Sequence, residues 1–302
     1  MILVLGGTGF IGKNLAVYLH ARGISIRVVS RTPDVGFLEA HASGTNALSL
    51  EQFLADPKSA LFDIETVVYL ASTSTPSSNS ESPWREASET VKTALRIMTA
   101  VAHHSQANFI YLSSGGAIYG ETTFDKIPED SPLNPISPYG LGKKMTEDSI
   151  SFMARTQGLS AAILRPSNPI GNWQVSLSQG VVGALMRAAR EGRDFPMIGQ
   201  GAAVRDYFDV RDLCQAIMDV IENPEKSSGK IWNVGSGVGS SVQELLDLVE
   251  EVSGRSIAVQ HLPPRPTDVA RVVLDTYAIH TAIGWAPRHE LRASLQNIWE
   301  TT

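Results

Sequence analysis

Two side chains in this sequence, Tyr139 and Lys143, stand four residues apart and together can move a proton. They fall at the start of a helical pattern that runs on through Phe152. Residues four apart lie on one face of a helix, one above the other. A lysine ammonium beside a phenol favours the phenolate, so the spacing predicts a lowered pKa for Tyr139 and acid–base chemistry on an alcohol hydroxyl. We therefore expect Tyr139 to act as the catalytic acid and base, with Lys143 as its partner.

A second chemical feature is the glycine pattern of the first twelve residues. Five apolar residues, typical of a strand buried on both faces, are followed by Gly6, Gly9 and Gly12 and then by a helical repeat. Such a strand, turn and helix let the pyrophosphate of a dinucleotide approach bare backbone at the positive end of the helix dipole. The pattern predicts a dinucleotide cofactor held by Gly6, Gly9, Phe10, Ile11 and Gly12.

The end of the next expected strand, residues 24–30, bears on which cofactor is bound. A carboxylate at this point accepts hydrogen bonds from the ribose hydroxyls of NAD and repels the 2′-phosphate of NADP. The sequence has Ser30 followed by Arg31 instead, a hydroxyl and a guanidinium that can pair with phosphate and stack on adenine. We expect Ser30 and Arg31 to contact the cofactor and to favour NADP, with NAD as the alternative.

The elements that must position these residues alternate along the chain. Buried strands are expected at residues 66–71, 108–113 and 161–165, with helical patterns at 84–104 and 139–152 between them. The alternation predicts an α/β fold, a Rossmann-type doubly wound parallel sheet that binds ligands at the carboxyl ends of its strands. The Ser-, Thr- and Pro-rich run 72–83 follows one such end, and we expect it to form a loop over the cofactor.

The rest of the chain indicates a smaller lobe of mixed α/β structure. Residues 34–62 are the least patterned, with one expected helix at 49–54. Later segments include helices at 181–191 and 242–253 and a strand at 230–234. The segment from Asp206 to Glu222 is expected to lead into a further helix. We expect residues 1–167 to form the NAD(P)-binding domain and residues 168–302 to form mainly a substrate-binding lobe, with a chain that can cross back.

Composition narrows the class of protein. The 302 residues are 43% hydrophobic and 19% charged, which suits a globular protein with a substantial core. A net charge of −6 without a basic run argues against a nucleic-acid partner, and no apolar stretch reaches the length of a membrane span. The single cysteine, Cys214, leaves no internal disulfide and no cysteine-based metal cluster. We expect a cytoplasmic protein without a metal.

The order of these pieces resembles the extended short-chain dehydrogenases/reductases, especially the nucleotide-sugar epimerases and dehydratases of the UDP-galactose 4-epimerase type. The resemblance spans nearly the whole chain and is specific for the family but much less so for the substrate. The matching segments are Gly6–Gly12, Ser113–Gly120, Ser137–Lys143, Leu164–Gly171, Gly201–Asp209, Asn233–Gly237 and Arg265–Asp268.

The resemblance implies roles for individual residues. Tyr139 would be the active-site acid and base, Lys143 would hold the nicotinamide ribose, and Ser114 would bind the reacting oxygen. Further implied cofactor contacts are Leu70, Ala71, Ser72 and Pro166. The implied contacts to a nucleotide-diphosphosugar substrate are Asn168, Arg205, Arg265 and Asp268. Arginine suits this task because it forms bidentate charge-assisted contacts with phosphate.

The sequence departs from the family's pattern in several places. Gly115 stands where the catalytic Ser or Thr usually is, which makes Ser114 the nearest hydroxyl. Ser30 replaces the usual ribose-binding aspartate, and Thr90 or Glu89 falls where an asparagine is common. Gly116 and Ala117 stand where the dehydratases carry an Asp-Glu pair, so we exclude a dehydratase.

Three functions are left open by the sequence. The leading hypothesis is an NAD(P)-dependent nucleotide-sugar epimerase that acts at sugar C4 through a transient 4-keto intermediate. The alternative is an NADPH-dependent reductase of a 4-keto sugar nucleotide, which the Ser30-Arg31 strand end favours. The alternative of another class is a non-catalytic NADP-sensing regulator, and the Tyr139–Lys143 pair argues against it. We also expect a homodimer, with the apolar helix near residues 91–101 pairing between subunits.

Overall fold

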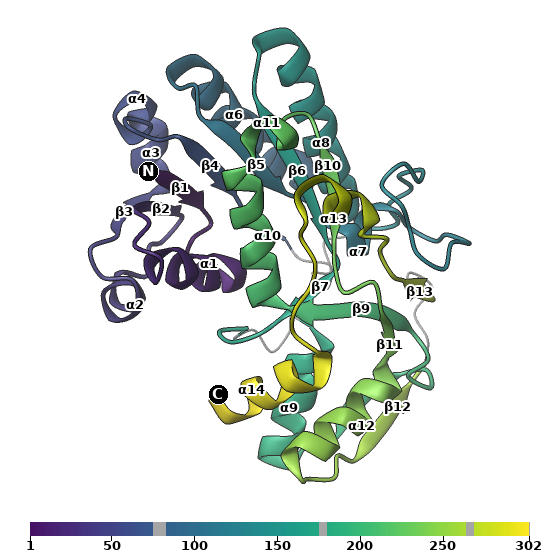
Figure 1. Cartoon of the computed structure of the whole chain (residues 1–302). Helices are drawn as coiled ribbons and strands as arrows, with labels where there is room; N and C mark the ends of the chain where they lie inside the picture. The colour runs from purple at the N-terminus through teal and green to yellow at the C-terminus, as the bar shows by residue number, and fades with distance from the viewer. Residues whose placement is uncertain (75–82, 175–179, 264–268, 302) are drawn as a thin grey trace.

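A seven-stranded parallel sheet forms the centre of the larger part of the molecule (Figure 1). The computed structural model describes residues 1–74, 83–174, 180–263 and 269–301, and the structural statements below concern those ranges. The strand order is β10-β6-β5-β4-β1-β2-β3. The strands are β1 (Ile2–Leu5), β2 (Ile26–Ser30), β3 (Asn46–Ser49), β4 (Thr66–Tyr69), β5 (Asn108–Leu112), β6 (Ala161–Pro166) and β10 (Ile231–Val234). The order reverses beside β1, which places a crevice at the carboxyl ends of β1 and β4.

Helices cover both faces of this sheet, because each strand carries apolar side chains on both of its sides. In β1, for example, Val4 packs into the hydrophobic cluster on one face and Leu3 into the cluster on the other. One face is covered by α1 (Phe10–His20), α2 (Val35–His41), α10 (Val210–Glu222) and α13 (Tyr277–Ile283). The other is covered by α3 (Leu50–Ala55), α4 (Pro57–Ala60), α6 (Lys92–His104) and α8 (Pro138–Gln157). The predicted Rossmann-type doubly wound sheet is therefore confirmed.

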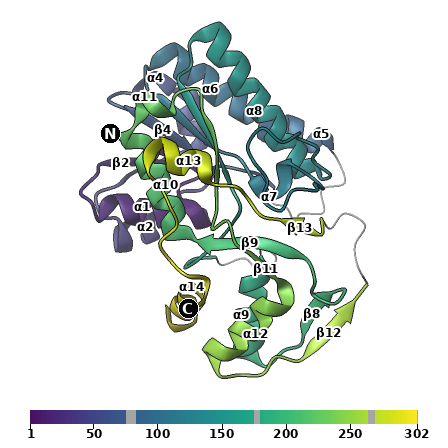
Figure 2. The same ribbon diagram turned by 45° about the vertical axis from the view of Figure 1, so that its right-hand side comes forward.

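A smaller lobe lies beside the carboxyl end of β6 (Figures 1 and 2). Its central strand is β9 (Val204–Asp209), which pairs with β7 (Asn168–Ile170), β11 (Gly239–Ser241) and β13 (Arg271–Val272). A separate pair joins β8 (Phe195–Ile198) to β12 (Val259–Leu262). The helices α9 (Val181–Glu191), α12 (Val242–Ser253) and α14 (Leu291–Thr301) enclose this lobe's own hydrophobic cluster. Because β7 begins two residues after β6 ends, the lobe is joined directly to the edge where ligands are expected.

Several expected elements differ in the structure. Helices α9 and α12 have the predicted bounds, but strand β10 lies in the large sheet beside β6 rather than in the smaller lobe. The poorly patterned residues 34–62 contain α2, β3 and α4 in addition to the predicted helix. The helical pattern at 84–104 is divided into α5 (Pro83–Arg85), a π-helix η1 (Glu86–Val91) and α6. The short helices α7 (Gly115–Ile118) and α11 (Pro224–Ser227) complete the fold, and no described helix combines the length and apolarity needed to cross a membrane.

Candidate active site

Helix α8 brings the Tyr139–Lys143 pair to the carboxyl end of the large sheet. The helix begins cleanly because Pro138 occupies its first turn and the Ser137 side chain accepts a hydrogen bond from the Gly140 N–H at 3.1 Å. The Lys143 ammonium donates to the Leu112 carbonyl at 2.8 Å, and Leu112 is the last residue of β5. The pair is thus held where β5 ends, on the crevice side of the sheet.

Lys143 is enclosed by protein, with 3% of its surface exposed. Its Nζ atom lies 5.6 Å from the ring centroid of Tyr139 and 5.0 Å from that of Tyr111. Burial lowers the pKa of Lys143 to about 8, against the carboxylates of Glu147 and Glu86, which raise it. Lys143 can therefore change its charge near neutral pH.

Tyr139 does not show the lowered pKa that its spacing from a lysine predicts. Burial raises the pKa of Tyr139 to about 12, a hydrogen bond with the Ser114 side chain lowers it, and the Glu86 charge raises it. Among the protein's own groups, desolvation of the phenolate outweighs the hydrogen bond with Ser114. The phenol is therefore the resting form that these side chains favour, and it can donate or accept through its bond with Ser114.

Ser114 provides the hydroxyl that the glycine at position 115 lacks. An ideal Cβ on Gly115 would lie 2.5 Å from Leu274 Cδ1 and 3.0 Å from the Arg165 carbonyl oxygen. No side chain fits at position 115 without displacing these atoms. Ser114 is the N-cap residue of α7 and bonds to Tyr139 instead, so one hydroxyl remains next to the phenol.

The glycine turn between β1 and α1 has open space beside Gly9, whereas Gly6 and Gly12 are packed too closely for any side chain. A Cβ on Gly12 would lie 2.2 Å from the Gly6 carbonyl oxygen, and one on Gly6, whose φ is +85°, would lie 2.8 Å from the Ala71 nitrogen. At Gly9, by contrast, the nearest atom to an ideal Cβ is the Gly6 carbonyl oxygen at 3.5 Å. Gly9 is the N-cap of α1 and makes no side-chain cap, so the N–H groups of Phe10, Ile11 and Gly12 border this open space. The turn fits a pyrophosphate approaching at Gly9.

The end of β2 carries a hydroxyl suited to a ribose. The Ser30 hydroxyl is buried and has no hydrogen-bond partner among the described residues. Arg31 beside it is exposed. The neighbouring Lys13 ammonium pairs with Asp34 at 2.6 Å, which brings α1 and the start of α2 together next to this strand end. The open glycine turn and the unpartnered Ser30 hydroxyl both fit a dinucleotide cofactor.

The remaining predicted cofactor contacts line the same edge. Leu70, Ala71 and Ser72 follow β4 and are half-buried, and the Ser72 hydroxyl donates to the Ser74 carbonyl at 2.8 Å. Pro166 is the buried last residue of β6. Most of the predicted loop 72–83 lies outside the described residues.

The predicted substrate contacts are only partly described. Asn168 begins β7 and its amide donates to the Asp206 carbonyl at 3.3 Å. The neighbouring Arg205, on β9, is half-buried and donates to the Val204 carbonyl at 2.8 Å. Arg265 and Asp268 lie outside the described residues. The structure therefore brings Asn168 and Arg205 to adjacent strands and leaves the other two residues as predictions.

A buried polar network behind the site was missed by the sequence reasoning. Arg165, on β6, donates to the Glu147 carboxylate at 2.7 Å and to the Tyr119 hydroxyl at 2.9 Å. Tyr119 in turn donates to the Asn233 side chain on β10 at 2.7 Å. Although burial opposes the charge, the Glu147 carboxylate raises the pKa of Arg165 above its ordinary value. The sequence feature that could have predicted this network is an arginine inside an otherwise apolar strand, because a buried charge needs a partner.

A second missed residue is Asp206, which joins three segments of the smaller lobe. Its carboxylate accepts hydrogen bonds from the Ser236 hydroxyl at 2.6 Å, from the Gly237 N–H at 3.1 Å and from the Leu274 N–H at 3.3 Å. The side chain has no exposed surface. By holding Leu274, Asp206 also fixes the side chain that closes position 115.

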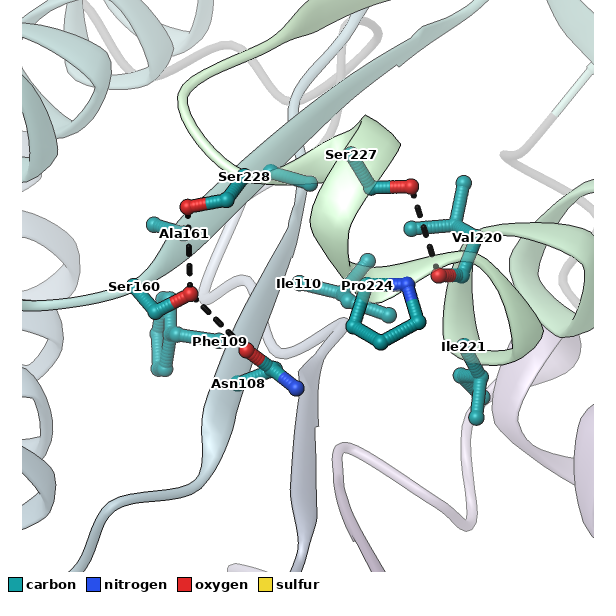
Figure 3. Close-up of a pocket in the computed structure, with 11 residues that line it drawn as sticks. Asn108, Phe109, Ile110, Ser160, Ala161, Val220, Ile221, Pro224, Ser227 and Ser228 are labelled. Atoms are coloured by element: carbon teal, nitrogen blue, oxygen red, sulfur yellow. Dashed lines mark hydrogen bonds between the residues drawn. The ribbon is translucent and has the colours of Figure 1, made fainter. Parts of the chain in front are cut away.

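A small cavity away from this site lacks groups that could carry out acid–base chemistry (Figure 3). It lies at the amino ends of β5 and β6 and is lined by residues such as Asn108, Ser160, Val220 and Ser228. None of its lining side chains is an acid or a base. The chemistry is therefore gathered at the opposite end of the strands.

This fold and site define a class: a dinucleotide-dependent enzyme of the tyrosine–lysine type, built on a Rossmann sheet. Comparison with known proteins agrees. The model of the NAD dependent epimerase/dehydratase family matches residues 2–235, and the chain belongs to that family.

Individual relatives resemble the chain over almost its full length. A putative UDP-glucose 4-epimerase of Methanocaldococcus jannaschii is 29% identical over 302 residues, covering 99% of this chain and 97% of the relative. The solved UDP-glucose 4-epimerase of Thermotoga maritima with UDP-glucose has a TM-score of 0.90 at 30% identity, covering 99% and 97% of the two chains. The corresponding enzyme of Thermus thermophilus, solved with NAD, has a TM-score of 0.88 at 26% identity over 99% and 97%.

Proposed function

We propose that this protein is a nucleotide-sugar epimerase that inverts C4 of a UDP-linked sugar through a transient 4-keto intermediate. The observation that carries the proposal is the Tyr139–Ser114 hydrogen bond beside Lys143, at the edge of the sheet where the glycine turn also lies. The membership of the family and the UDP-glucose 4-epimerases among the relatives support the same chemistry.

The protein's own groups supply the proton movements of this reaction. Ser114 holds the sugar C4 oxygen next to Tyr139, whose phenol must be ionised before it can accept a proton. The Lys143 cation and the positive ring of bound NAD would favour the phenolate, which then accepts the hydroxyl proton as the alcohol becomes a ketone. The chemistry that a bound nicotinamide would supply here is reversible hydride transfer at C4. Lys143, as a cation, stabilises the charge on the Tyr139 oxygen and holds the nicotinamide ribose. Tyr139 then returns the proton to the inverted alcohol, which leaves the protein unchanged.

We propose NAD as the cofactor, which corrects the sequence-based preference for NADP. The preference was based on Ser30 and Arg31, but the solved Thermus thermophilus relative holds NAD. The unpartnered Ser30 hydroxyl can bond a ribose hydroxyl without any 2′-phosphate. Denaturing the purified protein and identifying the released nucleotide by mass spectrometry tests this. Bound NADP(H), or tight binding of NADPH with weak binding of NADH, would restore the original preference.

The substrate's diphosphate and uridine belong, in this proposal, to the smaller lobe. Asn168 and Arg205 lie on adjacent strands of its sheet, and Arg265 and Asp268 complete the proposed contacts. With a division near residue 167, the cofactor would lie on the first domain and the nucleotide sugar between the two parts. Titration of UDP into Arg205→Ala and wild-type protein by calorimetry tests this, since loss of a phosphate-binding guanidinium weakens UDP but not NAD binding.

The reaction itself is tested by incubating the protein with a panel of UDP-sugars in D₂O without added nicotinamide. An epimerase converts UDP-galactose and UDP-glucose, or another C4 pair, into one mixture from either side. Because the hydride is returned to the same carbon, the product retains its C4 hydrogen. Net NADPH consumption with a 4-keto sugar nucleotide would point to the reductase. Nicotinamide binding without turnover of any nucleotide sugar would point to the sensor.

We propose that the protein is a homodimer that pairs through α6 and α8. A groove of about 550 Å³ runs along α6, bordered by η1, α3, α4 and Met145 of α8, and its lining includes Val91, Leu95 and Ala100. Leu95 on α6 and Phe152 on α8 are 38% and 54% exposed, although both are large and apolar. Sedimentation of wild-type and Leu95→Glu proteins tests the proposal, because a buried charge would shift the dimer to monomer. A monomeric wild type would overturn it.

A further inference from the structure

Glu86 is a carboxylate enclosed beside the Tyr139–Lys143 pair, and the mechanism above makes no use of it. Its residue is only 3% exposed. Its Oε2 atom is buried and has no hydrogen-bond partner among the described residues. Carboxylates are seldom fully buried without a partner, because burial removes their hydration. A role other than packing therefore has to explain why a carboxylate is buried at this position.

The position of Glu86 is fixed by a glycine on the catalytic helix. An ideal Cβ on Gly142 would lie 2.8 Å from Glu86 Oε2 and 3.3 Å from Glu86 Cβ. The carboxylate thus occupies the space that a side chain at position 142 would fill. Gly142 lies three residues after Tyr139 and directly before Lys143, so the carboxylate packs against the turn of α8 that carries both catalytic groups.

The π-helix η1 presents Glu86 to this surface. Glu86 is the first residue of η1, which packs on α8. Thr90, also buried on η1, is hydrogen-bonded to the Thr73 hydroxyl after β4, which ties η1 to the edge of the sheet. Glu89 on the same turn is exposed. Short π-helices are often found at functional sites.

Lys143 is a described cation on which the Glu86 charge acts, and the Glu147 carboxylate acts on Lys143 more strongly still. From α8, Lys143 and Glu147 face this region, but Glu147 is paired with Arg165 of β6 at 2.7 Å. From β5 comes the neutral phenol of Tyr111, whose pKa burial raises. Lys143 has the Glu86 charge among its electrostatic interactions, and so has Tyr139.

We propose that Glu86 is a positioning residue for the proposed epimerase reaction: its carboxylate, held against Gly142, is a buried counter-charge that, with Glu147, keeps Lys143 a cation beside Tyr139. The expected effect on kinetics rests on the proposed function, whereas the expected effect on the charge of Lys143 does not. Because the carboxylate favours the protonated lysine, it extends the pH range over which Lys143 is charged. Removing the negative charge lowers the pKa of Lys143, so the cation is lost at a lower pH.

Glu86→Gln tests this proposal because it removes the charge and keeps the shape, and Glu89→Gln is the exposed control on the same turn. The first readout is the Lys143 titration by NMR of protein with ¹³C-labelled lysine, assigned through Lys143→Met. The second is the alkaline limb of the pH profile of kcat/KM. We expect Glu86→Gln to move both midpoints down by about one pH unit, and Glu89→Gln to move neither.

A second variant approaches the same contact from the other helix. Gly142→Ala places a methyl group 2.8 Å from Glu86 Oε2, closer than the two atoms can pack, so the carboxylate must move away and the Lys143 midpoint should again fall. An unshifted Lys143 midpoint in Glu86→Gln overturns the proposal, even if that variant is less stable, and leaves Glu86 as a packing group. If the wild type turns over no nucleotide sugar, the proposed function fails, and the NMR titration still decides the role of Glu86.

Discussion

Leu274 occupies the space that a side chain at position 115 would need, with its Cδ1 atom 2.5 Å from an ideal Cβ on Gly115. Leu274 is itself held by a hydrogen bond from its N–H to the buried Asp206 carboxylate at 3.3 Å. A leucine from the smaller lobe thus fills the space next to position 115, which explains why a glycine stands there, just after β5. The hydroxyl chemistry of this strand end is left to Ser114.

Ser114→Ala should lower kcat by about 10²-fold, because the C4 oxygen loses a donor that strengthens as charge develops. The measurement is steady-state interconversion of UDP-galactose and UDP-glucose. Ser149→Ala on α8, whose hydroxyl only bonds back to the Met145 carbonyl, is the matched control and should behave as wild type. Full activity in Ser114→Ala would show that another group binds the reacting oxygen.

Tyr139→Phe should reduce turnover by about 10²- to 10⁴-fold, because it removes the proton acceptor and leaves the ring. Cofactor affinity, measured by fluorescence titration, should stay near that of the wild type. Tyr277→Phe is the control, since Tyr277 is 72% exposed on α13. Unchanged turnover in Tyr139→Phe would remove the phenol from the mechanism and favour the sensor.

Most of the large sheet could be predicted because its strands are short apolar runs that follow one another at regular intervals. The residues of β1, β4, β5 and β6 are mostly apolar on both sides, so the pattern alone identifies these strands. By contrast β3 is an edge strand with an exposed or half-buried surface, and its residues Asn46–Ser49 carry no such run. The return of the chain to the sheet at β10 depends on tertiary pairing, which the local sequence does not record.

Features of the site that depend on helical spacing could be predicted from the sequence. Features that depend on how deeply side chains are buried could not. Tyr139 and Lys143 share one helix, so their proximity follows from sequence. The pKa of Tyr139 could not be predicted, since it depends on how much water the surrounding elements exclude. Likewise the contact between Glu86 and Gly142 joins two helices, and the single π turn that aligns them leaves no clear trace in the residue pattern.

Gly9→Ala and Gly12→Ala should separate cofactor binding from folding. Among the described residues, a methyl group at position 9 meets only the Gly6 carbonyl oxygen at 3.5 Å, whereas one at position 12 would lie 2.2 Å from the same atom. We expect Gly9→Ala to retain wild-type thermal stability and lose at least about tenfold in NAD affinity, since a pyrophosphate needs that space. Gly12→Ala should lower the melting temperature. Gly36→Ala, in α2, is the control, because no atom of the described part of the chain lies within 4 Å of an ideal Cβ there.

The alkaline limb of activity should reflect Lys143. Its pKa is lowered by burial to about 8, so the cation is present below pH 8 and is lost as the pH rises through that value. In the protein with bound NAD, whose positive ring favours the Tyr139 phenolate at neutral pH, we expect kcat/KM of the wild type to decline above about pH 8. In Lys143→Met the residual activity should lack this limb, because no ammonium remains to titrate. A limb that persists unchanged in that variant would assign it to another group.

Glu147→Gln should destabilise the fold far more than loss of a surface ion pair. The Glu147 and Arg165 side chains are 4% and 3% exposed and lie 2.7 Å apart, so removing one charge leaves the other buried and unpaired. Such a loss costs about 3–5 kcal/mol of unfolding free energy, whereas the exposed pair of Lys144 and Asp148 contributes about 1 kcal/mol or less. Urea unfolding of Glu147→Gln and Asp148→Asn compares the two directly. Equal midpoints would mean that water reaches Arg165. A combined Glu147→Leu and Arg165→Met variant should recover part of the loss, because it removes both charges together.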